Sequence, residues 1–212
     1  MTTVLLTGFE PFADDQTNPS GDAVVRLAAA WTGPARLVTA ILPVDFTRAS
    51  AELIELVSTH RPDVVIATGL AGGRDAITPE RFAVNLRDAR IPDNAGYQPV
   101  DTACVPGAPL AYVSSLPIKA IAQEIAASGI PASVSLSAGS FVCNDVFFTL
   151  AHLSASTPGL RAGFIHVPWD AESAPAGASS LPQADIARAL EIAVRTTLTH
   201  TSDLDIPGGH LA

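Results

Sequence analysis

The sequence predicts a single-domain α/β fold with three α/β/α layers, in which a mostly parallel, twisted sheet carries helices on both faces. The first observation is that short apolar segments alternate along the chain with longer amphipathic ones, the order expected of β-α-β units. The second is that apolar residues make up 48% of the 212 residues and charged residues 16%, a balance opposite to that of disordered chains. A chain of this length suits one domain over residues 1–212.

The first half of the chain contains the clearest strands. Apolar runs predict buried strands at residues 4–6, 37–42 and 64–67, with another strand at 82–86. Between them, apolar residues at helical spacing predict helices at 19–31 and 45–60. Pro19 suits a first helical turn, and Asn18 is a possible N-cap. A glycine-rich turn, residues 69–73, follows the third strand.

The second half begins with a long excursion rich in Pro, Gly, Asp and Asn, residues 87–116. A segment of that length in a compact domain is usually functional or interfacial. The remaining elements are expected as helices at 117–128, 141–153 and 183–199, as strands at 132–136 and 163–167, and as a loop at 170–182. The tail from about residue 203 is expected to fray, with Asp203 and Asp205 solvated.

Charge and cysteine content exclude several classes of protein. The net charge of −9 and the pI near 4.8 argue against nucleic acid, because phosphate binding requires a basic face. Cys104 and Cys143 form no CxxC pair, and the five histidines lack metal-binding spacing, so we expect no metal. No segment of the sequence resembles a targeting signal, and none approaches the ~18 apolar residues that a membrane helix needs. We therefore expect no membrane contact and a cytoplasmic protein with free thiols.

Cys143 and His166 are the residues that most suggest chemistry. Cys143 lies in the first turn of a predicted helix, where the helix dipole favours a thiolate and backbone N–H groups can hold an oxyanion. His166 ends a predicted strand 23 residues later, an interval that fits one helix and one strand. The strand can therefore return the imidazole to the thiol as a general base. Taken alone, each residue is more often structural.

A carboxylate is expected to orient the imidazole. Glu80, Asp88 and Asp93 all lie near strand ends, and spacing does not choose among them. The glycine-rich turn lacks both nucleotide-binding patterns, so we interpret it as a place where backbone approaches a small ligand. Phe9 and Phe12 follow the first strand, either over the ligand-binding edge of the sheet or packed into the core.

Seven short motifs occur in order between residue 4 and about residue 169. They are Thr-Gly-Phe-Glu-Pro-Phe (7–12), Asn-Pro-Ser (18–20), Gly-Leu-Ala-Gly-Gly-Arg (69–74), Arg-Ile-Pro-Asp-Asn (90–94), Leu-Pro-Ile-Lys-Ala-Ile (116–121), Ser-Ala-Gly-Ser-Phe-Val-Cys-Asn (137–144) and Gly-Phe-Ile-His-Val-Pro (163–168). In these motifs the chain resembles the pyrrolidone carboxyl peptidase family, also called pyroglutamyl peptidase I. The resemblance implies one α/β/α domain, commonly assembled as a homotetramer, with no metal or organic cofactor.

The resemblance further implies a cysteine peptidase that removes an N-terminal pyroglutamyl residue from peptides. It implies that Cys143 is the nucleophile, His166 the base and Glu80 the third member, and it suggests Arg90 on the oxyanion side. Around the substrate ring it suggests a mostly apolar set: Phe9, Phe12, Asn18, Leu70, Ile91, Phe141 and Val142.

The chain departs from the family pattern at two positions. Leu70 stands where glutamine is usual, which removes one polar contact to substrate. Asp145 stands where histidine is frequent, and we expect it to face solvent, because a negative charge turned toward Cys143 would oppose the thiolate.

Two other functions compete with the peptidase. A phosphorylase or nucleosidase would hold phosphate at the glycine-rich turn, where Arg74 is the basic residue. Phosphate-dependent release of a base from a nucleoside would support it. A non-catalytic binder would keep the pocket without turnover, and the combination of Cys, His and Glu argues against it.

Overall fold

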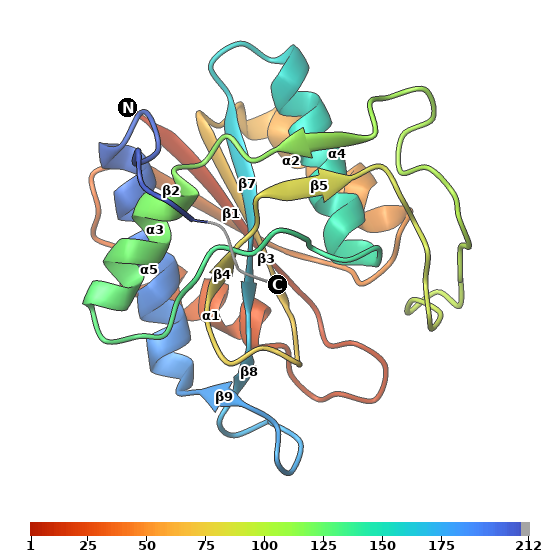
Figure 1. Ribbon diagram of the computed structural model, residues 1–212, viewed down its shortest axis with the longest axis horizontal. Helices are drawn as coiled ribbons and strands as arrows, with labels where there is room; N and C mark the ends of the chain where they lie inside the picture. Colours follow the sequence, from red (N-terminus) through yellow and green to blue (C-terminus); the bar gives the residue numbers. More distant parts are fainter. Residues whose placement is uncertain (209–212) are drawn as a thin grey trace.

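A five-stranded sheet forms the centre of the computed structural model, which describes residues 1–208 (Figure 1). Its strand order is β2-β1-β3-β7-β4. The first four strands are parallel, and the short β4 runs antiparallel to β7. The strands are β1 (Thr3–Phe9), β2 (Arg36–Leu42), β3 (Val64–Leu70), β7 (Arg161–Val167) and β4 (Thr78–Pro79). In a sheet of this kind ligands bind at the carboxyl ends of the strands, where β1, β3 and β7 end side by side.

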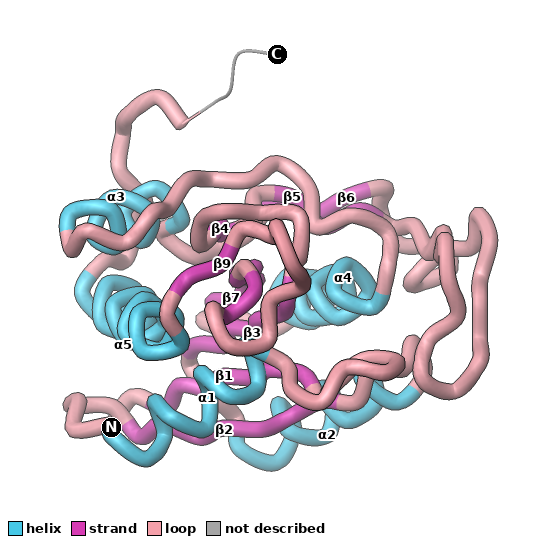
Figure 2. The backbone as a smooth tube through the Cα atoms, turned by 90° about the horizontal axis from the view of Figure 1, so that it is seen from below, coloured by secondary structure: helices cyan, strands magenta, loops and turns pink. Residues whose placement is uncertain are grey.

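Helices cover both faces of the sheet, which confirms the predicted three layers (Figure 2). One face carries α1 (Pro19–Ala30), α3 (Ile118–Ala127) and α5 (Gln183–Thr199), and the other carries α2 (Arg48–His60) and α4 (Val142–Ser156). Side chains alternate along each strand, so Leu6 packs toward the first layer and Leu5 toward the second. Within residues 1–208, none of the helices has the length and apolar character to cross a membrane.

Two segments expected to join the main sheet lie outside it. Residues 132–136 are not a strand, and only isolated bridges join Ala132 to Ile77 and Ser135 to Glu80. The sheet edge there is the two-residue β4, too short to extend a ladder. The strand expected at 82–86 is shorter, β5 (Phe82–Val84), and pairs with β6 (Ala111–Val113) in a separate two-stranded sheet. A further small pair, β8 (Trp169–Asp170) with β9 (Ser180–Leu181), frames the expected loop 170–182.

Asp203, in the tail that was expected to fray, binds the rest of the protein, so the expectation that it is only solvated was wrong. The Asp203 carboxylate accepts hydrogen bonds from the backbone N–H groups of Lys119 and Ala120, at 3.0 and 3.1 Å through Oδ1. These groups belong to the first turn of α3, whose N-cap residue Pro117 has no capping side chain. Asp203 therefore caps α3 from a distant part of the chain. Residues 209–212, the end of the same tail, lie outside the described residues.

Replacing Asp203 with alanine is expected to destabilise the fold by about 1 kcal/mol, the usual effect of losing a capping side chain. Urea-induced unfolding of the wild type and the variant measures this difference. Asp205→Ala is the control, since its carboxylate receives no such bonds within residues 1–208 and should leave the midpoint unchanged. Equal midpoints for Asp203→Ala and wild type would show that the cap does not stabilise α3.

Candidate active site

Cys143 lies at the N-terminus of α4, directly against the backbone of β3. The N-cap residue Phe141 makes no side-chain capping bond, so the first N–H groups of α4 are left for another acceptor. A Cβ atom built on Gly69 would be 2.7 Å from Cys143 Sγ and 2.9 Å from Phe164 Cζ. Only glycine leaves room for the sulfur here, which explains the first glycine of the turn that follows β3.

His166 reaches the same place from the neighbouring strand. Gly69 of β3 pairs with His166 of β7 in the parallel register, so the imidazole belongs to the strand residue beside Gly69, the glycine against which Cys143 Sγ lies. His166 Nδ1 lies 2.7 Å from Glu80 Oε1. Glu80 is completely buried directly after β4, and its backbone N–H donates to the Phe164 carbonyl at 2.9 Å.

The other two carboxylates that spacing left open lie elsewhere. Asp88 is exposed on the excursion. Asp93 is buried, but its oxygens accept backbone N–H groups of Phe46, Ala95 and Tyr97 at 2.8–3.0 Å. The structure therefore brings Cys143, His166 and Glu80 together and uses Asp93 to hold a turn.

The electrostatic environment favours the neutral forms of the thiol and the imidazole. Burial raises the pKa of the Cys143 thiol to about 12, and Glu80 adds to the increase, while Arg74 and the backbone N–H of Cys143 oppose it. Burial lowers the pKa of His166, although its hydrogen bond to Glu80 acts in the opposite direction. At neutral pH the unliganded site thus holds a thiol and an uncharged imidazole that is able to accept its proton.

Thiol acidity does not separate the two cysteines, but their positions do. Burial also raises the pKa of Cys104 to about 12, with Asp145 the next contributor. Cys104 is buried, and its sulfur contacts Val84 O and Asn144 Nδ2 at 3.6 and 3.8 Å. Cys143 is half-buried and lines a cavity. Only Cys143 combines access with a neighbouring imidazole.

A cavity of about 420 Å³ opens beside Cys143. Most residues that the sequence suggested for the substrate ring line it: Phe9, Phe12, Asn18, Leu70, Phe141 and Val142, with Arg90. Ile91 is not among the lining residues, and its side chain is 38% exposed. The volume is in the usual range for a small-molecule site.

Three lining residues were missed by sequence reasoning, Asp15, Val44 and Trp169, whereas Gly72 lies in the glycine-rich turn that was expected to approach a ligand. Trp169 had a signal, because it follows the His166 strand closely and a large aromatic after a strand end faces the ligand edge. A Cβ built on Gly72 would be 2.5 Å from Trp169 Nε1, so the glycine-rich turn also makes room for this ring. Asp15 and Val44 follow no motif that distinguishes them from other loop residues.

Aromatic rings form one wall of the cavity. Phe141 packs edge to face against Phe12 and Phe46, with centroids 5.5 and 5.2 Å apart. Asn18 contributes less polarity than expected. Its Oδ1 accepts from Ser20 N and Oγ as the cap of α1, and its Nδ2 donates to Glu10 O at 2.9 Å. One amide hydrogen of Asn18 is left for a ligand.

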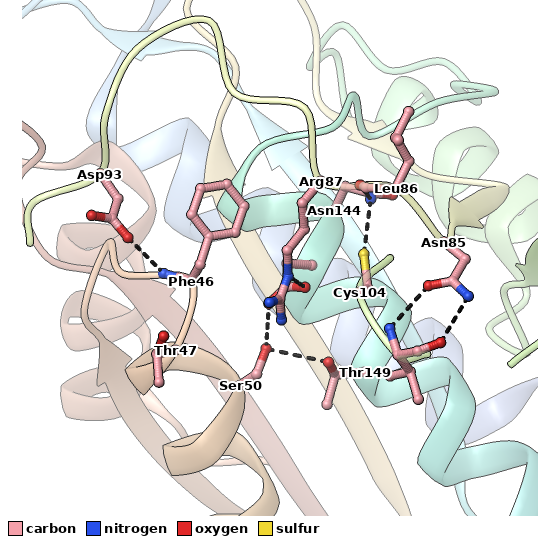
Figure 3. A network of polar contacts seen from close by, with 12 residues as sticks. Phe46, Thr47, Ser50, Asn85, Leu86, Arg87, Asp93, Cys104, Asn144 and Thr149 are labelled. Atoms are coloured by element: carbon pink, nitrogen blue, oxygen red, sulfur yellow. Dashed lines mark hydrogen bonds and ion pairs between the residues drawn. The ribbon is translucent and has the colours of Figure 1, made fainter. Parts of the chain in front are cut away.

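Asp145 is completely buried, so the expectation that it faces solvent was wrong. Its carboxylate accepts Arg87 Nε at 2.6 Å and Ser50 Oγ at 2.8 Å. Thr149 Oγ1, one turn further along α4, donates to Ser50 Oγ at 3.2 Å (Figure 3). Two residues of helix rotate the side chain by about 200°, so Asp145 points away from Cys143, toward α2 and the excursion. The negative charge is thus paired with Arg87 rather than turned on the thiol.

Asn144, in the first turn of α4, binds the segment that precedes Arg90. Its side chain accepts from Val84 N at 3.0 Å and donates to the carbonyls of Val84 and Leu86 at 2.8 and 3.0 Å. The first turn of α4 therefore fixes residues 84–87, and the excursion that starts there brings Arg90 to the cavity.

A thiol at a helix N-terminus, next to an imidazole that a buried carboxylate holds, is the arrangement of a cysteine hydrolase. The chain belongs to the pyroglutamyl peptidase family, whose model matches residues 2–200. The phosphorylase-like and non-catalytic alternatives receive no support from these similarities.

Relatives and solved structures agree over nearly the whole chain. A pyrrolidone-carboxylate peptidase of Bacillus amyloliquefaciens is 48% identical over 210 residues, which cover 98% of each chain. One from Clavibacter michiganensis is 45% identical over 212 residues and covers both chains completely. The crystal structure of pyroglutamyl peptidase I from B. amyloliquefaciens superposes with a TM-score of 0.92 at 47% identity, over 96% of this chain and 100% of that chain. The structure of pyrrolidone carboxyl peptidase from Thermococcus litoralis superposes with a TM-score of 0.90 at 39% identity, over 98% of this chain and 100% of that chain.

Proposed function

We propose that the protein hydrolyses the amide bond that follows an N-terminal pyroglutamyl residue of peptides, with Cys143 as nucleophile, His166 as base and Glu80 as its orienting carboxylate. The observation that carries this proposal is the placement of Cys143 Sγ on the wall of a cavity, beside an imidazole whose Nδ1 contacts a buried carboxylate. The relatives with this fold bear the name of this activity.

The cavity suits a small uncharged lactam. Pyroglutamate has no free α-amino group, and the aromatic wall of Phe12 and Phe141 can cover its flat ring. A charged amine placed there would lose its hydration without a full replacement, which costs several kcal/mol. We propose that Asn18 and Leu70 lie at the edges of the bound ring. We also propose that the first N–H groups of α4, together with Arg90, stabilise the developing oxyanion.

Each step uses groups already in place. His166 takes the proton of Cys143 Sγ, and the thiolate attacks the carbonyl carbon of the pyroglutamyl residue. The tetrahedral intermediate collapses when the imidazolium gives that proton to the leaving amine, which releases the shortened peptide and leaves a thioester. His166 then takes a proton from water, the hydroxide displaces Sγ, and pyroglutamate leaves as the thiol is restored.

Hydrolysis of a fluorogenic pyroglutamyl amide tests this function, with the proline and glutamine amides as controls. Proline keeps the five-membered ring but has a charged amine and no lactam carbonyl, and glutamine keeps the side-chain carbonyl without the ring. Release from the pyroglutamyl compound alone is the expected result. Equal release from all three, or none from reduced, folded protein, would contradict the proposal.

Replacing Glu80 with glutamine is expected to lower kcat/KM without abolishing turnover, since the third member usually contributes less than the nucleophile. The amide keeps the shape of the carboxylate but cannot balance the imidazolium that forms during the reaction. Steady-state kinetics on the pyroglutamyl amide measures the effect. Glu124→Gln, an exposed change on α3, is the matched control and should leave the rate unchanged. Wild-type activity in Glu80→Gln would remove Glu80 from the mechanism.

We also infer a single folded domain that assembles as a homotetramer in the cytoplasm. Apolar side chains on and beside the excursion are 64%, 88% and 62% exposed at Val100, Leu110 and Val113, which supports burial against further copies. Both cysteines are free, which suits a reducing compartment. Light scattering of the purified chain measures the mass and tests the assembly.

A further inference from the structure

Arg74 contacts the carboxylate that holds His166. Its Nη1 donates to Glu80 Oε1 at 2.6 Å and to Thr78 Oγ1, and its Nη2 donates to the Ser137 carbonyl at 3.0 Å. Thr78 lies on β4, Glu80 lies directly after β4, and Ser137 lies on the loop that leads into α4. Arg74 itself ends the glycine-rich turn after β3, where its backbone N–H donates to Ala71 O at 3.0 Å. One guanidinium thus joins the segments that carry the orienting carboxylate and the nucleophile.

We propose that Arg74 is a positioning residue for catalysis, which acts through Glu80 to fix the tautomer and the protonation of His166. This inference rests on the proposed function and assigns to Arg74 a role that neither the cysteine nor the histidine supplies.

A single oxygen atom of Glu80 links Arg74 to His166. Glu80 Oε1 accepts from Arg74 Nη1 at 2.6 Å and lies 2.7 Å from His166 Nδ1, whereas Glu80 Oε2 has no hydrogen-bond partner within residues 1–208. A buried carboxylate held through one oxygen depends on those two partners for its orientation. An oxygen that accepts from Arg74 also requires Nδ1 of His166 to be the donor. The lone pair of Nε2 is then free to receive the proton of Cys143.

Two charged side chains act on the imidazole of His166. Glu80, beyond β4, and Arg74, from the turn after β3, are the charged groups that act on His166, and Cys143 is the titratable group that α4 presents. Phe164 packs against the ring at 4.8 Å. The positive charge of Arg74 opposes a second positive charge on the imidazole, so it contributes to the lowered pKa of His166. Removing that charge raises the pKa of His166 and protonates the base over a wider range of acidic pH.

The experiment compares the pH dependence of kcat/KM for the wild type, Arg74→Gln, Arg74→Lys and Arg81→Gln. In Arg74→Gln we expect kcat/KM at its optimum to fall by about tenfold to a hundredfold, the effect of one charged hydrogen bond, and the acidic limb to move to higher pH. Arg74→Lys keeps the charge but not the fork that spans Glu80 and Ser137, so its acidic limb should stay near that of the wild type while its rate remains reduced. Arg81→Gln is the matched control, because its side chain lies against Gly208 and forms no ion pair with Glu80 within residues 1–208.

Three results would overturn the inference. A reduced rate with an unmoved acidic limb in Arg74→Gln would show that Arg74 only supports the fold. A full wild-type rate in that variant would remove it from catalysis, and the same shift in Arg81→Gln would indicate a general charge effect.

An NMR titration of the His166 imidazole in the Cys143→Ser protein separates this inference from the proposed function. The midpoint should rise when Arg74→Gln is added, whatever substrate the enzyme takes. Lack of peptidase activity in the wild type would refute the proposed function alone, whereas an unchanged titration would refute the role of Arg74.

Discussion

Replacing Cys143 with serine is expected to abolish hydrolysis of pyroglutamyl amides while leaving the fold intact. The hydroxyl fills nearly the same volume against Gly69, so the free energy of unfolding should stay within about 1–2 kcal/mol of the wild type. The hydroxyl is a far weaker acid than the thiol, and the burial that lowers the pKa of His166 also limits its strength as a base. Steady-state kinetics together with thermal unfolding separates loss of chemistry from loss of structure.

Cys104→Ser is the matched control, since Cys104 is the other thiol and lies outside the cavity. It should keep its rate per folded molecule. Iodoacetamide at neutral pH should label Cys143 in preference to Cys104, and a pyroglutamyl ligand in the cavity should slow that labelling. Turnover in Cys143→Ser at the wild-type rate, or labelling confined to Cys104, would exclude cysteine catalysis at this site.

Replacing Asp145 with alanine is expected to destabilise the protein by about 3 kcal/mol, the lower end of the effect of removing one member of a buried ion pair, because the Arg87 side chain is 20% exposed. Arg87 would keep its charge but lose the carboxylate oxygen that lies 2.6 Å from its Nε. Ser50 Oγ would lose the carboxylate oxygen that accepts its hydrogen bond at 2.8 Å. A loss of this size is a large fraction of the stability of most domains, about 5–15 kcal/mol. Guanidinium unfolding followed by fluorescence measures it.

The exposed pair Arg48–Glu52 on α2 provides the comparison, because its atoms lie 3.2 Å apart at the surface. Glu52→Ala should cost at most about 1 kcal/mol. Asp145→Asn should fall between the two, since its amide oxygen still accepts one of the two bonds. Equal losses in Asp145→Ala and Glu52→Ala would show that the buried pair does not stabilise the first turns of α4.

The sequence predicts elements well where one local pattern determines them. The helix expected at 183–199 is α5, Gln183–Thr199, because its apolar residues follow the helical period without interruption. Residues 132–136 alternate apolar and polar residues like a strand, yet the partner edge is too short to pair with them. Local pattern cannot reveal the length of a neighbouring strand.

The candidate site was likewise predicted where local sequence context determines it and not where distant partners do. The short-range context of Cys143 and of His166 is visible in the sequence, as a helix start and a strand end. The choice of Glu80 over Asp93 depends on β4 running antiparallel beside β7, which spacing does not encode. Asp145 was expected to face solvent, but it is buried and binds Arg87. Asp203 was expected to be only solvated, but although exposed it also binds the start of α3. Sequence spacing does not reveal partners this far away in the chain.

The polar contacts of the first turn of α4 have a consequence for how the cavity opens. Asn144 binds Val84 and Leu86, and Asp145 binds Arg87, so the start of the excursion is attached to the helix that presents the sulfur. Local unfolding involves cooperative units that often coincide with packed supersecondary motifs. The start of the excursion is therefore expected to lose its order together with the first turn of the helix that carries Cys143, rather than to open alone.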